Sequence, residues 1–349
     1  MNEKFEKKEK MKITFYPYTY VRTLVMRSKK LQKEDFNNLI KMDIQEIINF
    51  LQSKGYTEFA SLANEYKGIE LIERSLKKHL VFQFNKLRKI SNEDLKEVID
   101  AYLMRYDLRN LKTSFRGLKF KQKVNHLIVP AGVFSENFYN EIVKKDNIEE
   151  VYPLLRNSIF YSIRNFKNET LFELENNLDK IYYDYLFSFV SNLGNQSKLF
   201  KEFTMEEVKV RNILTILKIL KENNKENTKK LDIKKVLLPY NGSSLIKKLK
   251  FAKNLDEAIV ILKKSRYKKS MDVLLDDFKK SGSLINLEKE IRKHLLNKLK
   301  HYAFHNILSI DVILDFMFEQ DIEVKNLLLI FKAKIFGMDK KFIEDNLII

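Results

Sequence analysis

The stretch RYDLRNLKTSFR at residues 105–116 decides the fold, because two related stretches follow it along the chain. They are EVKVRNILTILK at 207–218 and DIEVKNLLLIFK at 321–332. Each has apolar residues two before, one after and five after a shared asparagine, which is the spacing of one face of an α-helix. The asparagines are Asn110, Asn212 and Asn326, at intervals of 102 and 114 residues. The pattern predicts one helical unit present in three copies.

A second pattern repeats at nearly the same intervals. It reads IELIERSLKKHL at 69–80, LFELENNLDKIY at 171–182 and LINLEKEIRKHL at 284–295, with apolar residues at relative positions 1, 4, 8 and 12. A glutamate directly follows the second apolar position of each copy. These glutamates are Glu73, Glu175 and Glu288, at intervals of 102 and 113 residues. Two independent patterns with matching intervals indicate a tandem triplication, so we expect both residue sets to be structurally equivalent between copies.

The composition predicts an all-α fold. Only 8 glycines and 4 prolines occur among 349 residues, far too few for the many tight turns of a β-rich protein. The clearest interior breaks are LIVPAG around Pro130 and LLPYNG around Pro239, and a polar run spans 221–230. We therefore predict three tandem homologous helical domains after a charged N-terminal extension. The predicted boundaries are 1–12 for the extension and 13–118, 119–222 and 223–349 for the domains.

The chain carries 65 Lys and Arg against 47 Asp and Glu, a net charge of +18, which favours an acidic partner. Basic residues recur at two fixed positions relative to the asparagines: one residue before and six residues after each of them. These candidate interface residues are Arg109, Arg116, Arg211, Lys218, Lys325 and Lys332. Seven residues apart, the members of each pair share one helix face. Two interpretations fit: an ordinary solvated helix face, or a threefold basic surface that binds an acidic partner.

The repeated asparagine also allows two interpretations. It could be a functional hydrogen-bonding group, or it could make a structural contact to a neighbouring helix or a backbone carbonyl. Its presence in three copies favours the structural interpretation, because an active site seldom needs three equivalents.

The sequence predicts no catalytic, cofactor or metal site. No two glycines lie closer than 13 residues, so neither G-x-G-x-x-G nor G-x-x-x-x-G-K-[ST] occurs, and we expect no intrinsic ATPase activity. With no cysteine, thiolate zinc sites and disulfides are excluded. His301 and His305 could share a helix face as a metal pair, but no third ligand accompanies them.

Membrane insertion and nucleic-acid binding receive little support from the sequence. No segment approaches the roughly 18 consecutive apolar residues that a membrane-spanning helix needs, and the charged stretch MNEKFEKKEK is unlike a signal peptide. The aromatic residues fall mainly on apolar stripes, which suits core packing better than base stacking. The basic charge still leaves one alternative function open, a helical scaffold that binds nucleic acid or an anionic membrane surface.

Several separated motifs resemble one family. The stretches at 16–31, 101–117, 127–132, 171–186 and 321–338 resemble the C subunits of archaeal and bacterial A/V-type ATP synthases, which correspond to the d subunit of eukaryotes. The family pattern E-I-D-x-x-N is relaxed here, since Lys209 and Glu323 stand where the first copy has Asp107. This departure weakens any fixed role for a carboxylate at that position.

The resemblance implies a non-catalytic rotor subunit. It implies an all-helical funnel with pseudo-threefold symmetry that joins the central shaft to the membrane proteolipid ring and couples ATP synthesis or hydrolysis to proton or sodium transport. The expected partners are the shaft subunits of the D and F type and the proteolipid ring, with no nucleic acid and no cofactor. The expected location is the cytoplasmic face of the cell membrane, as a peripheral protein held there through the ring.

Overall fold

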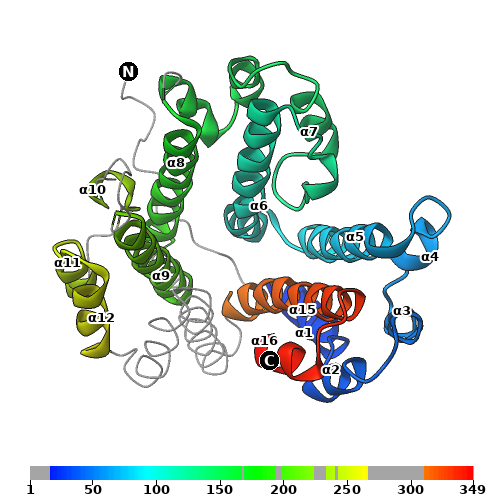
Figure 1. Cartoon of the computed structure of the whole chain (residues 1–349). Coiled ribbons are helices and arrows are strands. Elements are labelled where there is room, and N and C mark those ends of the chain that lie inside the picture. The colour runs from blue at the N-terminus through cyan, green and yellow to red at the C-terminus, as the bar shows by residue number, and fades with distance from the viewer. Residues whose placement is uncertain are drawn as a thin grey trace. The chain divides into compact units, whose positions relative to one another are not determined.

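The computed structural model describes residues 16–166, 169–193, 198–223, 233–239, 243–265 and 310–348. Every regular element in these ranges is a helix and none is a strand, which confirms the predicted all-α class (Figure 1). Glu288, His301 and His305 lie outside the described residues, so the structure does not place the third glutamate or the histidine pair.

Inter-residue contacts divide the described residues into two compact units. The first unit contains 16–151 together with 310–348, and the second contains the described residues between 152 and 265. The predicted third domain is therefore divided between the units. Its described residues up to 265 belong to the second unit, and residues 310–348 belong to the first. The boundaries of the three predicted domains stay a prediction.

The first unit is built on three long helices and several short ones. The long helices are α5 (Gly68–Lys89), α6 (Glu93–Phe120) and α15 (Asp311–Ile335). The short ones are α1 (Pro17–Ser28), α2 (Lys33–Leu39), α3 (Ile44–Ser53), α4 (Glu58–Leu62), α7 (Glu136–Ile142) and α16 (Lys340–Asn346), with the 3₁₀ helices η1 (Asn125–Leu127) and η2 (Glu149–Leu155), the last of which runs into the second unit.

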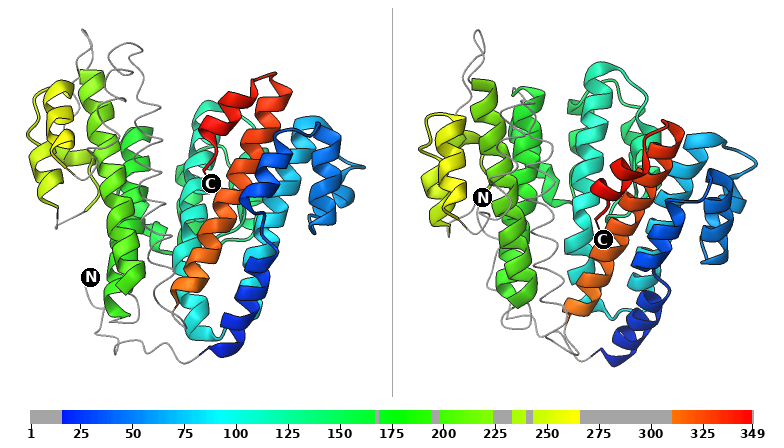
Figure 2. Two further views of the ribbon diagram at one scale, coloured as in Figure 1. Left: turned by 90° about the horizontal axis from the view of Figure 1, so that it is seen from below. Right: turned by 60° about the horizontal axis from the view of Figure 1, so that its bottom comes forward.

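Helix α15 lies in the core of the first unit although it comes from the end of the chain. It packs against α5 and α1, and Figure 2 shows α1 and α15 running side by side. Its side chains Leu327 and Phe331 are fully buried, and the ring of Phe331 contacts that of Phe59 at 6.2 Å between centroids. Burying one such aromatic side chain contributes about 1.5–3 kcal/mol, so this packing fixes the end of the chain to its beginning.

The second unit contains η3 (Ile159–Phe166), α8 (Leu171–Asn192), α9 (Lys198–Asn223), α10 (Ile233–Val236), α11 (Ser244–Leu249) and α12 (Leu255–Lys263). Helix α8 packs on η3 and α9, and α9 also contacts α10, α11 and α12. The buried rings of Tyr182 and Tyr183 lie on α8. Thr170 starts this helix through a reciprocal capping box with Glu173, which satisfies two otherwise unpaired backbone groups.

Candidate functional site

The three repeated asparagines make the same pair of hydrogen bonds. Each side-chain amide donates to the carbonyl oxygen of a residue in a following segment and accepts a hydrogen bond from that same residue's backbone N–H. The distances are 2.8 and 3.0 Å from Asn110 to Val129, 3.1 and 2.9 Å from Asn212 to Leu238, and 2.8 and 3.0 Å from Asn326 to Ile348. We call these contacts the asparagine clamps.

Two of the clamps use the proline breaks noted in the sequence. Val129 precedes Pro130 and Leu238 precedes Pro239, and a residue before proline is pushed toward extended backbone. Extended backbone turns the N–H and the carbonyl of one residue outward, where a carboxamide with one donor and one acceptor can bind both. The asparagines thus tie each long helix to the segment that comes after it.

Two buried carboxylates stand three residues before clamp asparagines. Asp107 accepts hydrogen bonds from the Val133 N–H at 2.6 Å, the Phe134 N–H at 3.2 Å and the Tyr139 hydroxyl at 2.7 Å. Glu323 accepts from the Leu31 N–H at 2.9 Å and from the Tyr56 hydroxyl. Both carboxylates therefore bind a backbone N–H and a tyrosine hydroxyl, although Glu323 departs from the aspartate of the family pattern that Asp107 keeps.

Burial raises the pKa of both carboxyls, to about 6 for Asp107 and about 7 for Glu323, against the hydrogen bonds that favour the charged form. With folded pKa values above the unfolded ones, the native state binds more protons than the unfolded state between about pH 4 and pH 7. The free energy of unfolding supplied by these two groups should therefore fall as the pH rises through that window.

We predict that Asp107→Asn and Glu323→Gln each flatten this pH dependence. Between about pH 5 and pH 7 each variant should lose about 1–2 kcal/mol less stability than the unmodified chain, at about 1.4 kcal/mol per pKa unit. Urea unfolding followed by circular dichroism measures the difference. Identical pH profiles for the variants and the unmodified chain would show that neither carboxyl titrates in this range.

All six candidate interface residues are exposed, and three of them lie in one part of the first unit. Lys332 on α15 forms an ion pair with Glu73 on α5 at 2.8 Å, and Lys77 lies 3.8 Å from the same carboxylate. Lys325 forms an ion pair with Asp321, which also accepts a hydrogen bond from the Tyr106 hydroxyl at 2.7 Å. The guanidinium of Arg109 lies over the Tyr106 ring, 5.0 Å from its centroid.

We define the charged surface as the side chains that α5, α6 and α15 contribute here: Glu73, Lys77, Arg109, Asp321, Lys325 and Lys332. Burial acts to raise the pKa of Asp321, but Lys325 and Arg109 outweigh it and lower that pKa to about 2. Burial also acts to raise the pKa of Glu73, but Lys332 and Lys77 outweigh it. The pKa of Glu73 therefore lies below its ordinary value. The two carboxylates are thus ionised and surrounded by cations that reach toward solvent.

The other candidate residues lie elsewhere. Arg116 is two helical turns beyond Arg109 on α6. Arg211 and Lys218 are on α9 in the second unit, where Arg211 pairs with Glu207 at 3.3 Å and lies 5.4 Å from the centroid of the Tyr183 ring. Glu175, the second repeated glutamate, is on α8. The sequence located the exposed cations, but it did not indicate that Glu73 and Lys332 from different copies would pair.

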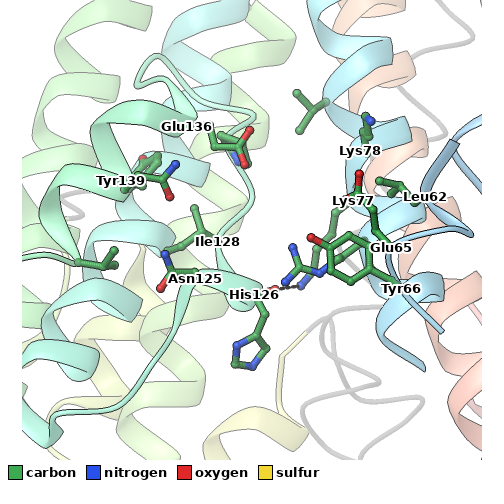
Figure 3. A pocket seen from close by; sticks show the side chains of 15 residues that line it. Leu62, Glu65, Tyr66, Lys77, Lys78, Asn125, His126, Ile128, Glu136 and Tyr139 are labelled. Atoms are coloured by element: carbon green, nitrogen blue, oxygen red, sulfur yellow. Dashed lines mark hydrogen bonds between the residues drawn. The ribbon is translucent and has the colours of Figure 1, made fainter. Parts of the chain in front are cut away.

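A cavity of about 400 Å³ adjoins the charged surface within the first unit (Figure 3). Residues of α4 and α5 and the turn between them line one side, and η1 and α7 with their flanking residues line the other. The Lys77 ammonium donates to the His126 carbonyl oxygen at 2.7 Å across this space. Burial lowers the pKa of Lys77, although Glu73 opposes this effect. The lining mixes Arg74 and Lys78 with Glu65 and Glu136.

The described part of the chain holds no group of three or more His, Asp or Glu side chains placed to bind a metal ion. Among its helices, none combines the length and the apolar character that crossing a membrane requires.

Comparison with known proteins identifies the family. The model of the ATP synthase (C/AC39) subunit family matches residues 20–346. The chain is 29% identical to the C subunit of the A-type ATP synthase from Methanosarcina acetivorans, over 98% of this chain and 95% of that protein. It is 30% identical to the corresponding protein of Methanosarcina mazei over the same shares, and 26% identical to that of Haloferax volcanii over 95% and 97%. The resemblance noted in the sequence is confirmed: the chain belongs to the ATP synthase (C/AC39) subunit family.

Proposed function

We propose that this chain is a non-catalytic rotor subunit of an A/V-type ATP synthase that links the central shaft to the membrane proteolipid ring. The observation that carries the proposal is the family match across residues 20–346. In this role the chain couples ATP synthesis or hydrolysis to proton or sodium transport by transmitting torque. Its partners are the D-type and F-type shaft subunits and the ring, which holds it at the cytoplasmic face of the membrane.

The asparagine clamps support a body made of three equivalent parts. Each clamp joins a long helix to a later segment through two hydrogen bonds, so a load on one long helix is carried into the segment that follows. Two hydrogen bonds to one backbone residue also fix the orientation of that segment relative to the helix better than a single hydrogen bond would. We propose that the three copies form a funnel with pseudo-threefold symmetry, with domains at 13–118, 119–222 and 223–349.

The charged surface is the proposed contact with an acidic part of the shaft or the ring. Lys325 and Lys332 are paired with carboxylates, but their side chains are still 53% and 46% exposed. Such exposed pairs contribute roughly 0–1 kcal/mol, so a partner carboxylate can compete for the cation at little cost. Glu73 and Asp321 meanwhile hold the ammonium groups in place before the partner arrives.

We predict that charge reversal uncouples ATP hydrolysis from ion pumping in the assembled complex for at least one basic pair. The double variants are Arg109→Glu with Arg116→Glu, Arg211→Glu with Lys218→Glu, and Lys325→Glu with Lys332→Glu. Interfacial charges act mainly on association rate and register, so reversal should do more harm than neutralisation. ATP hydrolysis and ion transport are measured on the same reconstituted preparation.

The matched control is Lys41→Glu with Lys89→Glu, a reversal of two exposed lysines outside the charged surface. Helical content and the thermal midpoint establish folding first, because surface charge changes usually stay within about 0.5 kcal/mol. If all three pairs fold, assemble and pump like the control, the basic faces are solvated surface. A steep salt-dependent affinity of the purified chain for nucleic acid, lost with the same reversals, would favour the basic scaffold instead.

A further inference from the structure

Helix α1 turns most of its apolar side chains away from the core of its own unit. Its buried residues are Thr19, Thr23 and Met26, and the two threonine hydroxyls donate to the carbonyl oxygens of Ile90 at 2.6 Å and Thr19 at 2.7 Å. The side chains left outside are Tyr18, Val21, Leu24 and Val25, with exposed fractions of 63%, 55%, 39% and 47%. An amphipathic helix at a protein surface normally has the opposite orientation.

Three of these four outward apolar side chains, together with the exposed Ser28, follow the spacing of a helix-pairing seam, and Leu24 lies beside it. Tyr18, Val21, Val25 and Ser28 stand at i, i+3, i+7 and i+10, which are successive a and d positions of a heptad. At about 100° per residue their mean direction lies roughly 160° from that of the buried threonines. We call Tyr18, Val21, Val25 and Ser28 the α1 seam. A seam this narrow suits another helix better than a broad apolar surface, because it fills one line of holes.

The charges beside the seam have one sign. Arg22 and Lys29 occupy the two e positions next to it, and both are exposed. Across residues 11–33 six lysines and arginines occur with no aspartate or glutamate. Arg27 on the other side of α1 and Lys30, two residues beyond its end, are ion-paired with Glu319 on α15. The charges that α1 places beside the seam are therefore cations, and e positions are where charges select the partner of a coiled coil.

We propose that the α1 seam is a docking surface for an amphipathic helix of another polypeptide, with apolar residues in its seam and carboxylates flanking them. Two copies of α1 do not meet this description, because Arg22 and Lys29 of each would face like charges. The inference goes beyond the shaft-to-ring role, since α1 contributes no residue to the charged surface, but it rests on the proposed function in that the partner is sought in the assembled complex. Co-purification of the chain with the complex, measured before cross-linking, distinguishes a failure of the proposed function from a failure of this inference.

Photo-cross-linking in the assembled ATP synthase tests the proposal. The photoreactive residue p-benzoylphenylalanine replaces Tyr18 or Val25 in the full chain, and mass spectrometry identifies the cross-linked peptide. The control position is Val133, which is 52% exposed and outside α1. The expected result is a cross-link from both seam positions, but not from Val133, to one helical segment with aspartate or glutamate beside its apolar heptad positions.

Charge reversal tests the stated chemistry of the partner. Arg22→Glu with Lys29→Glu should lower the yield of the Val25 cross-link at least ~5-fold, whereas Lys41→Glu with Lys89→Glu should leave it unchanged. An unchanged yield after the first reversal would contradict an acidic partner. Cross-links to lipid, to a second copy, to residues of this chain itself or to a segment without carboxylates would overturn the proposal, as would the absence of any cross-link from both positions.

Discussion

Replacing Asn110 or Asn212 by alanine is expected to lower the free energy of unfolding by about 2–4 kcal/mol, since each change breaks two buried hydrogen bonds. The alanine also leaves a buried N–H and a buried carbonyl of Val129 or Leu238 without their side-chain partner. Asn326→Ala should cost less, about 1–2 kcal/mol, because its contacts with Ile348 are only partly buried and water can replace the amide.

The loss of unfolding free energy is thus expected to be larger for Asn110→Ala and Asn212→Ala than for Asn326→Ala. Chemical denaturation of the three single variants gives the free energies, and Asn37→Ala is the control, because Asn37 is an exposed residue of helix α2. Asn110→Asp keeps the acceptor for the Val129 N–H but places an oxygen opposite the Val129 carbonyl. It should therefore be no more stable than Asn110→Ala. Losses as small as that of Asn37→Ala would mean that the clamps do not stabilise the fold.

The all-α class and the recurring asparagines could be predicted because both depend on local pattern. Helical spacing around Asn110 is visible in twelve residues, and few glycines and prolines leave no room for a turn-rich fold. The structural interpretation of the asparagine, which rests on its repetition, stays a prediction. The residue that each asparagine binds could not be named, since nothing local connects Asn326 to Ile348 across 22 residues.

The charged surface and the α1 seam could not be predicted from the sequence pattern, because both depend on how the helices pack. Glu73 and Lys332 belong to different copies, and only the packing of α15 on α5 brings them within 2.8 Å. Periodicity identifies an apolar stripe but not the side of the helix that is buried. Tyr18, Val21 and Val25 would be assigned to the core by their chemistry, yet threonines occupy that face.

The LIVPAG break between helices has a glycine at position 132, and the structure shows why. A Cβ atom at Gly132 would lie 2.1 Å from Oδ1 and 2.3 Å from Oδ2 of Asp107. Gly132 does not have a positive φ, so the requirement for glycine is one of space. Moving the carboxylate aside would break the hydrogen bonds that it accepts from Val133, Phe134 and Tyr139.

Gly132→Ala is therefore expected to lower the free energy of unfolding by about 3–5 kcal/mol, because the methyl group forces a buried carboxylate from its donors. Gly132→Ala should have little effect on stability when residue 107 carries no carboxylate. In an Asp107→Ala background, which is itself destabilised, adding Gly132→Ala should cost less than about 1 kcal/mol, so a double-mutant cycle should give a coupling of at least about 2 kcal/mol. Denaturant titration of the four proteins measures it. Equal costs in the two backgrounds would place the need for glycine in the backbone of the LIVPAG turn, and not in its contact with Asp107.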